Sequence, residues 1–147
     1  MDIYIVLRYI GGMMLTAREY QALAEVRFQL RTFLAFSESE ARSAGIEPQQ
    51  HQLLLAIRGL PEGERPTIRV LANRLVLRHH TVVELIDRLE ERQLVRREAD
   101  PDDGRVVLVR ILRRGNAILE RLSVPHRDEL AKIAPRLVTS LNALVTT

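Results

Sequence analysis

The stretch from His79 to Arg92 carries side chains that could read the bases of DNA. Its apolar residues recur at helical spacing and would form one buried face of a helix: Val82, Leu85, Ile86 and Leu89. The opposite face carries mostly hydrogen-bonding groups: His80, Thr81, Glu84, Arg88 and Glu91. A helix in the major groove needs this division, because the apolar stripe fixes the helix while polar side chains reach base edges. We therefore predict a DNA-recognition helix here.

His79 and His80 begin this helix, and the first residues of a recognition helix meet base edges or phosphates. The alternative is a pair of exposed surface histidines without a ligand. A metal site made by these two side chains is not expected, because adjacent residues on a helix point about 100° apart. We expect at least one of them to contact the groove.

Three more side chains of this face have possible partners in the groove. Thr81 could contact a phosphate or a thymine methyl, Glu84 could accept from cytosine N4, and Arg88 could reach guanine or a phosphate. Two of them have a second interpretation. Glu84 could orient Arg88, and Arg88 could form a salt bridge with Glu84 or Glu91 one helical turn away.

A hairpin with a charged tip follows the recognition helix. The runs Leu94–Glu98 and Val106–Ile111 have strand composition, and the residues between them (ADPDDGR) favour a turn. Arg105 lies at the tip, where it could enter the minor groove, whose negative potential favours arginine. Asp103 could orient Arg105 or be a solvated turn residue. We predict that Arg105 contacts DNA.

A short helix from Ile68 to Leu75, capped by Thr67, precedes the recognition helix. Its inward residues would be Val70, Leu71, Ala72 and Leu75. Thr67, Arg69 and Arg74 would border the groove and could meet phosphates, although a solvated helix face explains them equally well. This arrangement of two helices and a hairpin is a winged helix-turn-helix.

The elements that support this unit are long helices. A capping box, Thr16 to Glu19, predicts a helix to about Ala44 that ends at Gly45. Its apolar stripe comprises Leu23, Val26, Leu30, Phe33 and Leu34. A helix of this length in so small a protein usually needs a partner chain to cover it. A second helix begins at Pro48 and runs to about Leu60.

The residues after the hairpin again have a helical pattern, starting at Arg113. Pro125 predicts a kink or break near Val124, because proline lacks the N–H that the helix needs. Pro135 predicts the start of a separate last helix, whose inward residues would be Leu137, Val138, Leu141, Leu144 and Val145. The whole pattern predicts a mainly α fold with a small β-hairpin wing.

Residues 1–14 are expected to be an N-terminal extension. The apolar run there is too short to span a bilayer and lacks the marks of a signal peptide, so we expect a cytoplasmic protein. Met13 or Met14 could equally be the natural start.

Composition excludes several classes of function. The chain has 147 residues, no cysteine and a net charge of +3. Four histidines at unsuitable spacings form no zinc signature, and no phosphate loop or nucleophile elbow is present. We therefore expect no enzyme, no metal and no cofactor. Between Arg65 and Arg114 the chain has 12 arginines against 8 acidic residues, which suits nucleic acid.

Taken together, the chain resembles the MarR (multiple antibiotic resistance regulator) family of bacterial transcription regulators. Three segments carry the resemblance: VLANRLVLRHHTVVELIDRLEERQLVRR (Val70 to Arg97), DPDDGRVVLVRI (Asp100 to Ile111) and RGNAILERL (Arg114 to Leu122). It covers about Leu15 to Val145. Some positions depart from the family pattern: Val76 and Gln93 stand where glycine is common, Leu112 where threonine often caps a helix, and Val70 where glutamate is frequent.

The resemblance implies a homodimer that binds double-stranded DNA at a pseudo-palindromic operator, as a repressor modulated by a small molecule. Residues 15–44 and 113–147 would form the dimerisation helices, and residues 45–112 the winged helix-turn-helix lobe. His51 and His126 would lie near the effector pocket, although satisfied core or surface histidines are the alternative. A winged-helix module that binds another protein remains the second functional hypothesis.

Overall fold

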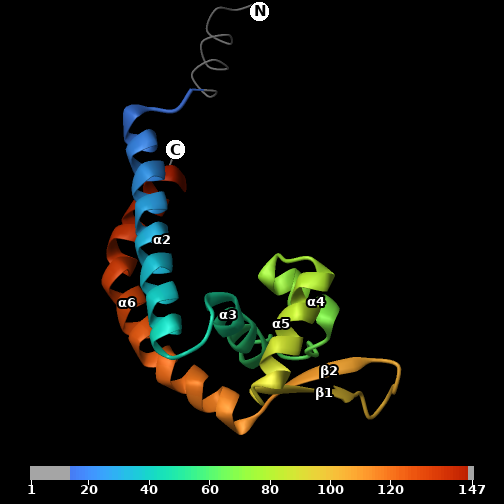
Figure 1. Ribbon diagram of the computed structural model, residues 1–147. Coiled ribbons are helices and arrows are strands. Elements are labelled where there is room, and N and C mark those ends of the chain that lie inside the picture. Colours follow the sequence, from blue (N-terminus) through green and yellow to red (C-terminus); the bar gives the residue numbers. More distant parts are fainter. Residues whose placement is uncertain (1–13, 146–147) are drawn as a thin grey trace, which may run out of the picture. The chain divides into compact units, whose positions relative to one another are not determined.

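The computed structural model describes residues 14–145. Except for Met14, the expected N-terminal extension lies outside these residues, as does the choice of natural start. The elements, in chain order, are α2 (Ala17–Ser43), α3 (Pro48–Arg58), α4 (Ile68–Leu75), α5 (His79–Glu91), β1 (Val95–Ala99), β2 (Val107–Ile111) and α6 (Arg113–Val145) (Figure 1). The predicted mainly α fold with a β-hairpin is confirmed. No described helix is long and apolar enough to cross a membrane.

The described residues divide into two compact units, one formed by residues 37–126 and the other by residues 14–36 with 127–145. We call them the winged unit and the helical unit. Both α2 and α6 contribute residues to each of them.

The core of the winged unit is built from α3, α4, α5 and the hairpin. Leu53 and Leu54 of α3 and Leu71 of α4 are fully buried. The four residues predicted for the inner face of α5, Val82, Leu85, Ile86 and Leu89, are all buried. Side chains at this spacing share one face of a helix, so burying them fixes which face remains outside.

The ends of the short helices follow local chemistry. Thr67 caps α4 by accepting a hydrogen bond from the Val70 N–H at 3.2 Å. Val76 ends the same helix with φ 54°, and Gln93 follows α5 with φ 59°. Both departures from the family pattern thus keep the left-handed backbone that glycine adopts without strain.

The hairpin pairs β1 with β2 in antiparallel register, from Val95↔Ile111 to Ala99↔Val107. Each strand begins one residue later than predicted. The N-terminal approach to α4 lies along β2: Thr67 forms an isolated bridge with Leu108, and the Val109 N–H donates to the Pro66 carbonyl at 2.9 Å. The hairpin is therefore attached to the start of α4.

In the helical unit, α2 and α6 run alongside each other (Figure 1). The buried residues there are Ala22 and Gln29 of α2 and Ile133 and Ser140 of α6. The predicted apolar stripe of α2 is mostly not covered, because Leu23, Leu30 and Leu34 are exposed. Within one chain, most of this stripe therefore stays in contact with solvent.

The expected break and separate last helix were wrong, because α6 is one helix across both Pro125 and Pro135. A proline inside a helix costs about 3 kcal/mol. Leu119 and Leu122 are buried before Pro125, and Ile133 is buried after it. Full burial of one such side chain contributes about 1.5–3 kcal/mol, so packing along α6 offsets the lost hydrogen bonds.

Candidate nucleic-acid interface

The predicted reading face of α5 is open to solvent. His79, His80, Glu84 and Arg88 are exposed, and Thr81 is half-buried. The histidines occupy the first two positions of the helix, after Arg78. All five belong to the winged unit, and the buried stripe of α5 fixes their outward orientation. The arrangement can present hydrogen-bonding groups to a groove.

Arg88 does not form the salt bridge considered as its alternative. Among residues 14–145 no ion pair joins it to Glu84 or Glu91. It instead lines a hollow of about 300 Å³ in the winged unit. The other lining residues come from the end of α2, the start of α3 and α5: Glu38, Arg42, Glu47, Pro48, Gln49, Gln50 and Leu85.

At the wing tip Arg105 is held by Asp103. The Arg105 side chain is 92% exposed. Its Nε donates to Asp103 Oδ1 at 3.1 Å and its Nη2 to Oδ2 at 3.3 Å. These side-chain hydrogen bonds, together with the one from the Arg105 backbone N–H, lower the pKa of Asp103. Asp103 therefore does orient a cation that points into solvent.

The three residues expected to border the groove have different surroundings. The Thr67 hydroxyl accepts from the α4 backbone, while Arg69 and Arg74 are exposed. Arg74 also lines a second hollow of about 300 Å³, with Gln49, Gln52, Leu75 and Leu77. Solvated arginines of this kind can meet phosphates.

Arg97 is a residue that the sequence reasoning missed. It lies on β1, and its guanidinium donates to Asp87 Oδ1 at 2.7 Å and to the Glu90 carboxylate, both on α5. The Arg97 N–H also donates to Glu90 Oε2 at 3.2 Å. Burial alone would lower the pKa of Arg97, but the hydrogen bonds to Asp87 and Glu90 raise it. The sequence did offer a signal: Asp87 and Glu90 lie three positions apart, on one face of the predicted helix, and a strand with a basic residue follows them.

His51 and His126 lie against each other inside the winged unit. Their ring centroids are 4.8 Å apart, and His51 is 2% exposed. His126 Nδ1 lies 2.7 Å from the Leu122 carbonyl and Nε2 lies 2.8 Å from the Ser37 hydroxyl. A carbonyl only accepts, so Nδ1 carries a proton and donates it to Leu122. This geometry favours the alternative of satisfied core histidines, and neither ring lines the hollow beside Arg88.

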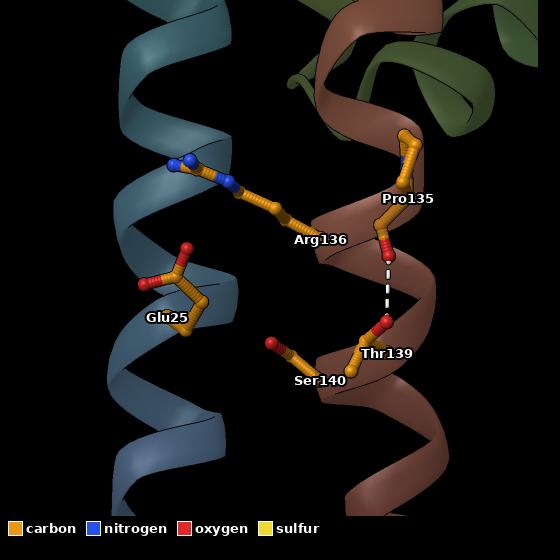
Figure 2. Close-up of a pocket in the computed structure, with 5 residues that line it drawn as sticks. All are labelled: Glu25, Pro135, Arg136, Thr139 and Ser140. Carbon is orange, nitrogen blue, oxygen red and sulfur yellow. Dashed lines mark hydrogen bonds between the residues drawn. The ribbon is translucent and has the colours of Figure 1, made fainter.

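A further hollow, of about 330 Å³, lies between α2 and α6 in the helical unit. Figure 2 shows the Arg136 side chain extending from α6 toward α2, where Glu25 lies, with Ser140 pointing into the gap. The Thr139 hydroxyl turns back to donate to the Pro135 carbonyl at 2.9 Å. The site mixes charged and apolar lining and contains no cluster suited to a metal; none occurs among residues 14–145.

Comparison with known proteins places the winged part of the chain beside one family. Residues 44–106 match the model described as the MarR family. This range spans the complete helix-turn-helix, β1 and the wing tip, the elements that carry the open face of α5 and Arg105. Residues 44–106 of this chain are thus similar to the MarR family of transcriptional regulators, in agreement with the resemblance drawn from the sequence.

Individual relatives agree with this placement. The uncharacterized HTH-type transcriptional regulator YsmB of Bacillus subtilis is 28% identical over 120 residues, which cover 79% of this chain and 80% of YsmB. The structure of AbsC, a MarR family regulator from Streptomyces coelicolor, matches with a TM-score of 0.70 at 22% identity, over 88% and 90% of the two chains. An S. aureus MepR mutant bound to an oligodeoxyribonucleotide matches with a TM-score of 0.62 at 18% identity, over 90% and 95%. The two solved structures show a shared fold.

Proposed function

We propose that this chain is a transcriptional repressor of the MarR type, which binds DNA sequence-specifically and acts as a homodimer. The observation that carries the proposal is Arg105, a solvent-exposed cation held at the wing tip by Asp103 in the same unit as the open polar face of α5. In this arrangement α5 enters the major groove through His79, His80, Thr81 and Glu84, while Arg105 enters the adjacent minor groove.

The phosphate contacts in this proposal come from residues that flank α5. Arg69 and Arg74 of α4 are solvent-exposed, and the Thr67 hydroxyl can still donate while it accepts from the Val70 N–H. Such contacts set the register of the protein on the duplex, whereas α5 side chains discriminate the bases. Arg88 lies farther along α5 and can reach a base or a phosphate.

The apolar surface of the helical unit supports the proposal of a homodimer. Tyr20, Phe28, Leu30 and Leu34 of α2 and Val138 and Leu141 of α6 are exposed. Monomeric proteins rarely leave so many large apolar side chains in water, and a second copy of the chain offers the same surface in return. Such a dimer would read a pseudo-palindromic operator with half-sites about one helical turn apart.

A small-molecule effector is the proposed signal. The hollow beside Arg88 touches α2, α3 and the recognition helix, so a ligand there would bias the orientation of α5. Two arginines, Arg42 and Arg88, line it. His51 and His126 remain a second possible effector position, reached only if their packed pair opens.

A binding titration on DNA upstream of the gene, repeated across salt concentrations, tests the function. Sequence preference together with a steep fall of log K against log salt is expected. Arg105→Gln should lower the magnitude of this slope by up to about 0.9, the value for one neutralised phosphate in B-DNA, because the cation placed in the minor groove is lost. Arg127→Gln, which removes an exposed arginine of the helical unit paired with its neighbour Asp128, is the matched control. Retention of a stoichiometric protein partner without DNA would support the protein-binding alternative.

A further inference from the structure

An ion pair ties the wing to a loop outside it. Arg65, in the loop before α4, contacts Asp100, which directly follows β1. The Asp100 side chain is 3% exposed, and that of Arg65 is 54% exposed. Asp100 Oδ1 accepts from the Asp102 N–H at 2.9 Å. No hydrogen bond within residues 14–145 reaches Oδ2, and the guanidinium of Arg65 is the cation that faces this buried oxygen.

Asp100 also lies where the wing tip begins. Its N–H donates to the Val106 carbonyl at 2.8 Å, and the Val106 N–H donates to the Asp103 carbonyl at 2.9 Å. Asp103 then holds the guanidinium of Arg105. The contacts form one path from Arg65 through Asp100 to Arg105.

The loop that carries Arg65 is itself fixed. The neighbouring Pro66 carbonyl accepts from Val109 of β2, and Thr67 both bridges to Leu108 and caps α4. Arg65 is therefore attached to the helix-turn-helix backbone, while its charged end reaches the start of the tip. A contact of this kind can transmit the position of α4 to the tip.

We propose that Arg65 is a positioning residue for DNA binding: it holds Asp100, and through Asp100 the wing tip, in the orientation that presents Arg105 to the duplex. The proposal rests on the proposed contact of Arg105 with DNA. Arg65 need not touch DNA in this role. Its charge also acts on Asp103, whose pKa is lowered chiefly by Arg105 and further by Arg65.

The test compares three single variants of the full chain, Arg65→Gln, Asp100→Asn and Arg105→Gln. It also includes two double variants, one changed at positions 65 and 100 and the other at positions 65 and 105. Two probes are used: a duplex that the wild-type protein selects from a random-sequence pool, and a random duplex of the same length. Each single change at position 65 or 100 should weaken binding to the selected duplex by about 10-fold. The variant changed at both positions should lose no more affinity than either single variant. Asparagine at 100 keeps an acceptor for the Asp102 N–H, so the tip turn is preserved.

The salt dependence separates positioning from direct contact. In the Arg105→Gln background, Arg65→Gln should leave the slope of log K against log salt nearly unchanged, because Arg65 acts through Arg105, whereas the loss of a direct phosphate contact by Arg65 would still lower the slope by roughly 0.9. Arg105→Gln should cost less in the Arg65→Gln background than in the wild type, because the tip is already misplaced. A residue needed only for stability would not produce this coupling.

Three outcomes would overturn the proposal. One is a slope change of about 0.9 for Arg65→Gln while Asp100→Asn binds normally, because Arg65 would then itself contact phosphate. Additive losses in the variant changed at positions 65 and 100, or no loss in either of the corresponding single variants, are the other two. If Asp100→Asn does not fold, the coupling between positions 65 and 105 decides alone. A wild-type protein that enriches no sequence from the random pool would overturn the proposed function as well.

Discussion

Arg97 of β1 and Asp87 of α5 are joined by an ion pair of 2.7 Å, and the same guanidinium also contacts Glu90. The side chain of Arg97 is 27% exposed and that of Glu90 is 33% exposed, so their contact is partly shielded from water, whereas Asp87 is open to solvent. It links the helix proposed to read the major groove with the strand that leads to the wing. The two proposed DNA-contacting parts are therefore held together by a charged, hydrogen-bonded contact.

Removing this contact should destabilise the winged unit. Arg97→Met keeps most of the apolar stem but leaves Asp87 and Glu90 without their cation, at an expected cost of about 1–3 kcal/mol in the free energy of unfolding. Urea unfolding followed by circular dichroism measures it. Arg127→Met, whose Asp128 partner is an exposed neighbour, should change stability by less than about 0.5 kcal/mol. Equal effects of the two substitutions would contradict a structural role for Arg97.

Val76→Gly should stabilise the protein. Val76 has φ 54° and is 89% exposed, so glycine relieves left-handed strain at little cost in buried surface. Relief of a β-branched residue from this region is expected to contribute about 1 kcal/mol net of the added freedom of the unfolded chain. Thermal unfolding measures the gain. Val76→Ala keeps the Cβ and should recover only part of it, so an equal gain for alanine would refute backbone strain as the cause.

Gly115→Ala should have the opposite effect. A Cβ at this position would lie 2.3 Å from the Leu94 carbonyl oxygen, which already accepts from the Leu112 N–H at 2.9 Å. The start of α6 would have to move away from the hairpin, at a cost of about 1–3 kcal/mol. Gly104→Ala, with no atom within 4 Å of its added Cβ, is the control for chemical denaturation. A neutral Gly115→Ala would show that the close approach is not required.

Acid should weaken the fold through His51. Burial, and then the charge of His126, lower the pKa of His51 from 6.5 to about 4. The unfolded chain therefore binds more protons between these two values, and stability falls as the pH drops from about 6.5 toward 4. A loss of up to about 3 kcal/mol is expected over this window. In the variant His51→Gln the slope of unfolding free energy against pH should flatten there; an unchanged slope would assign the effect to another group.

The residues of the reading face could be predicted because their placement is local. The apolar spacing of Val82, Leu85, Ile86 and Leu89 decides which side of α5 is buried, and so which side carries Glu84. Thr67 was recognised as a cap, and the tip of the wing by its turn residues, from neighbours only a few positions away. Where neighbouring residues determine the backbone conformation, the residue types alone are enough to predict it.

Tertiary structure decided the contacts between distant segments. Arg65 meets Asp100, and His51 meets His126, only because the packing of separate elements brings them together. The unbroken α6 depends on the same cause: Pro125 locally disfavours a helix, but burial of residues on both sides, such as Leu122 and Ile133, outweighs that preference. Sequence spacing thus determined the proposed DNA-reading side chains of this protein, whereas long-range packing decided what holds them in place.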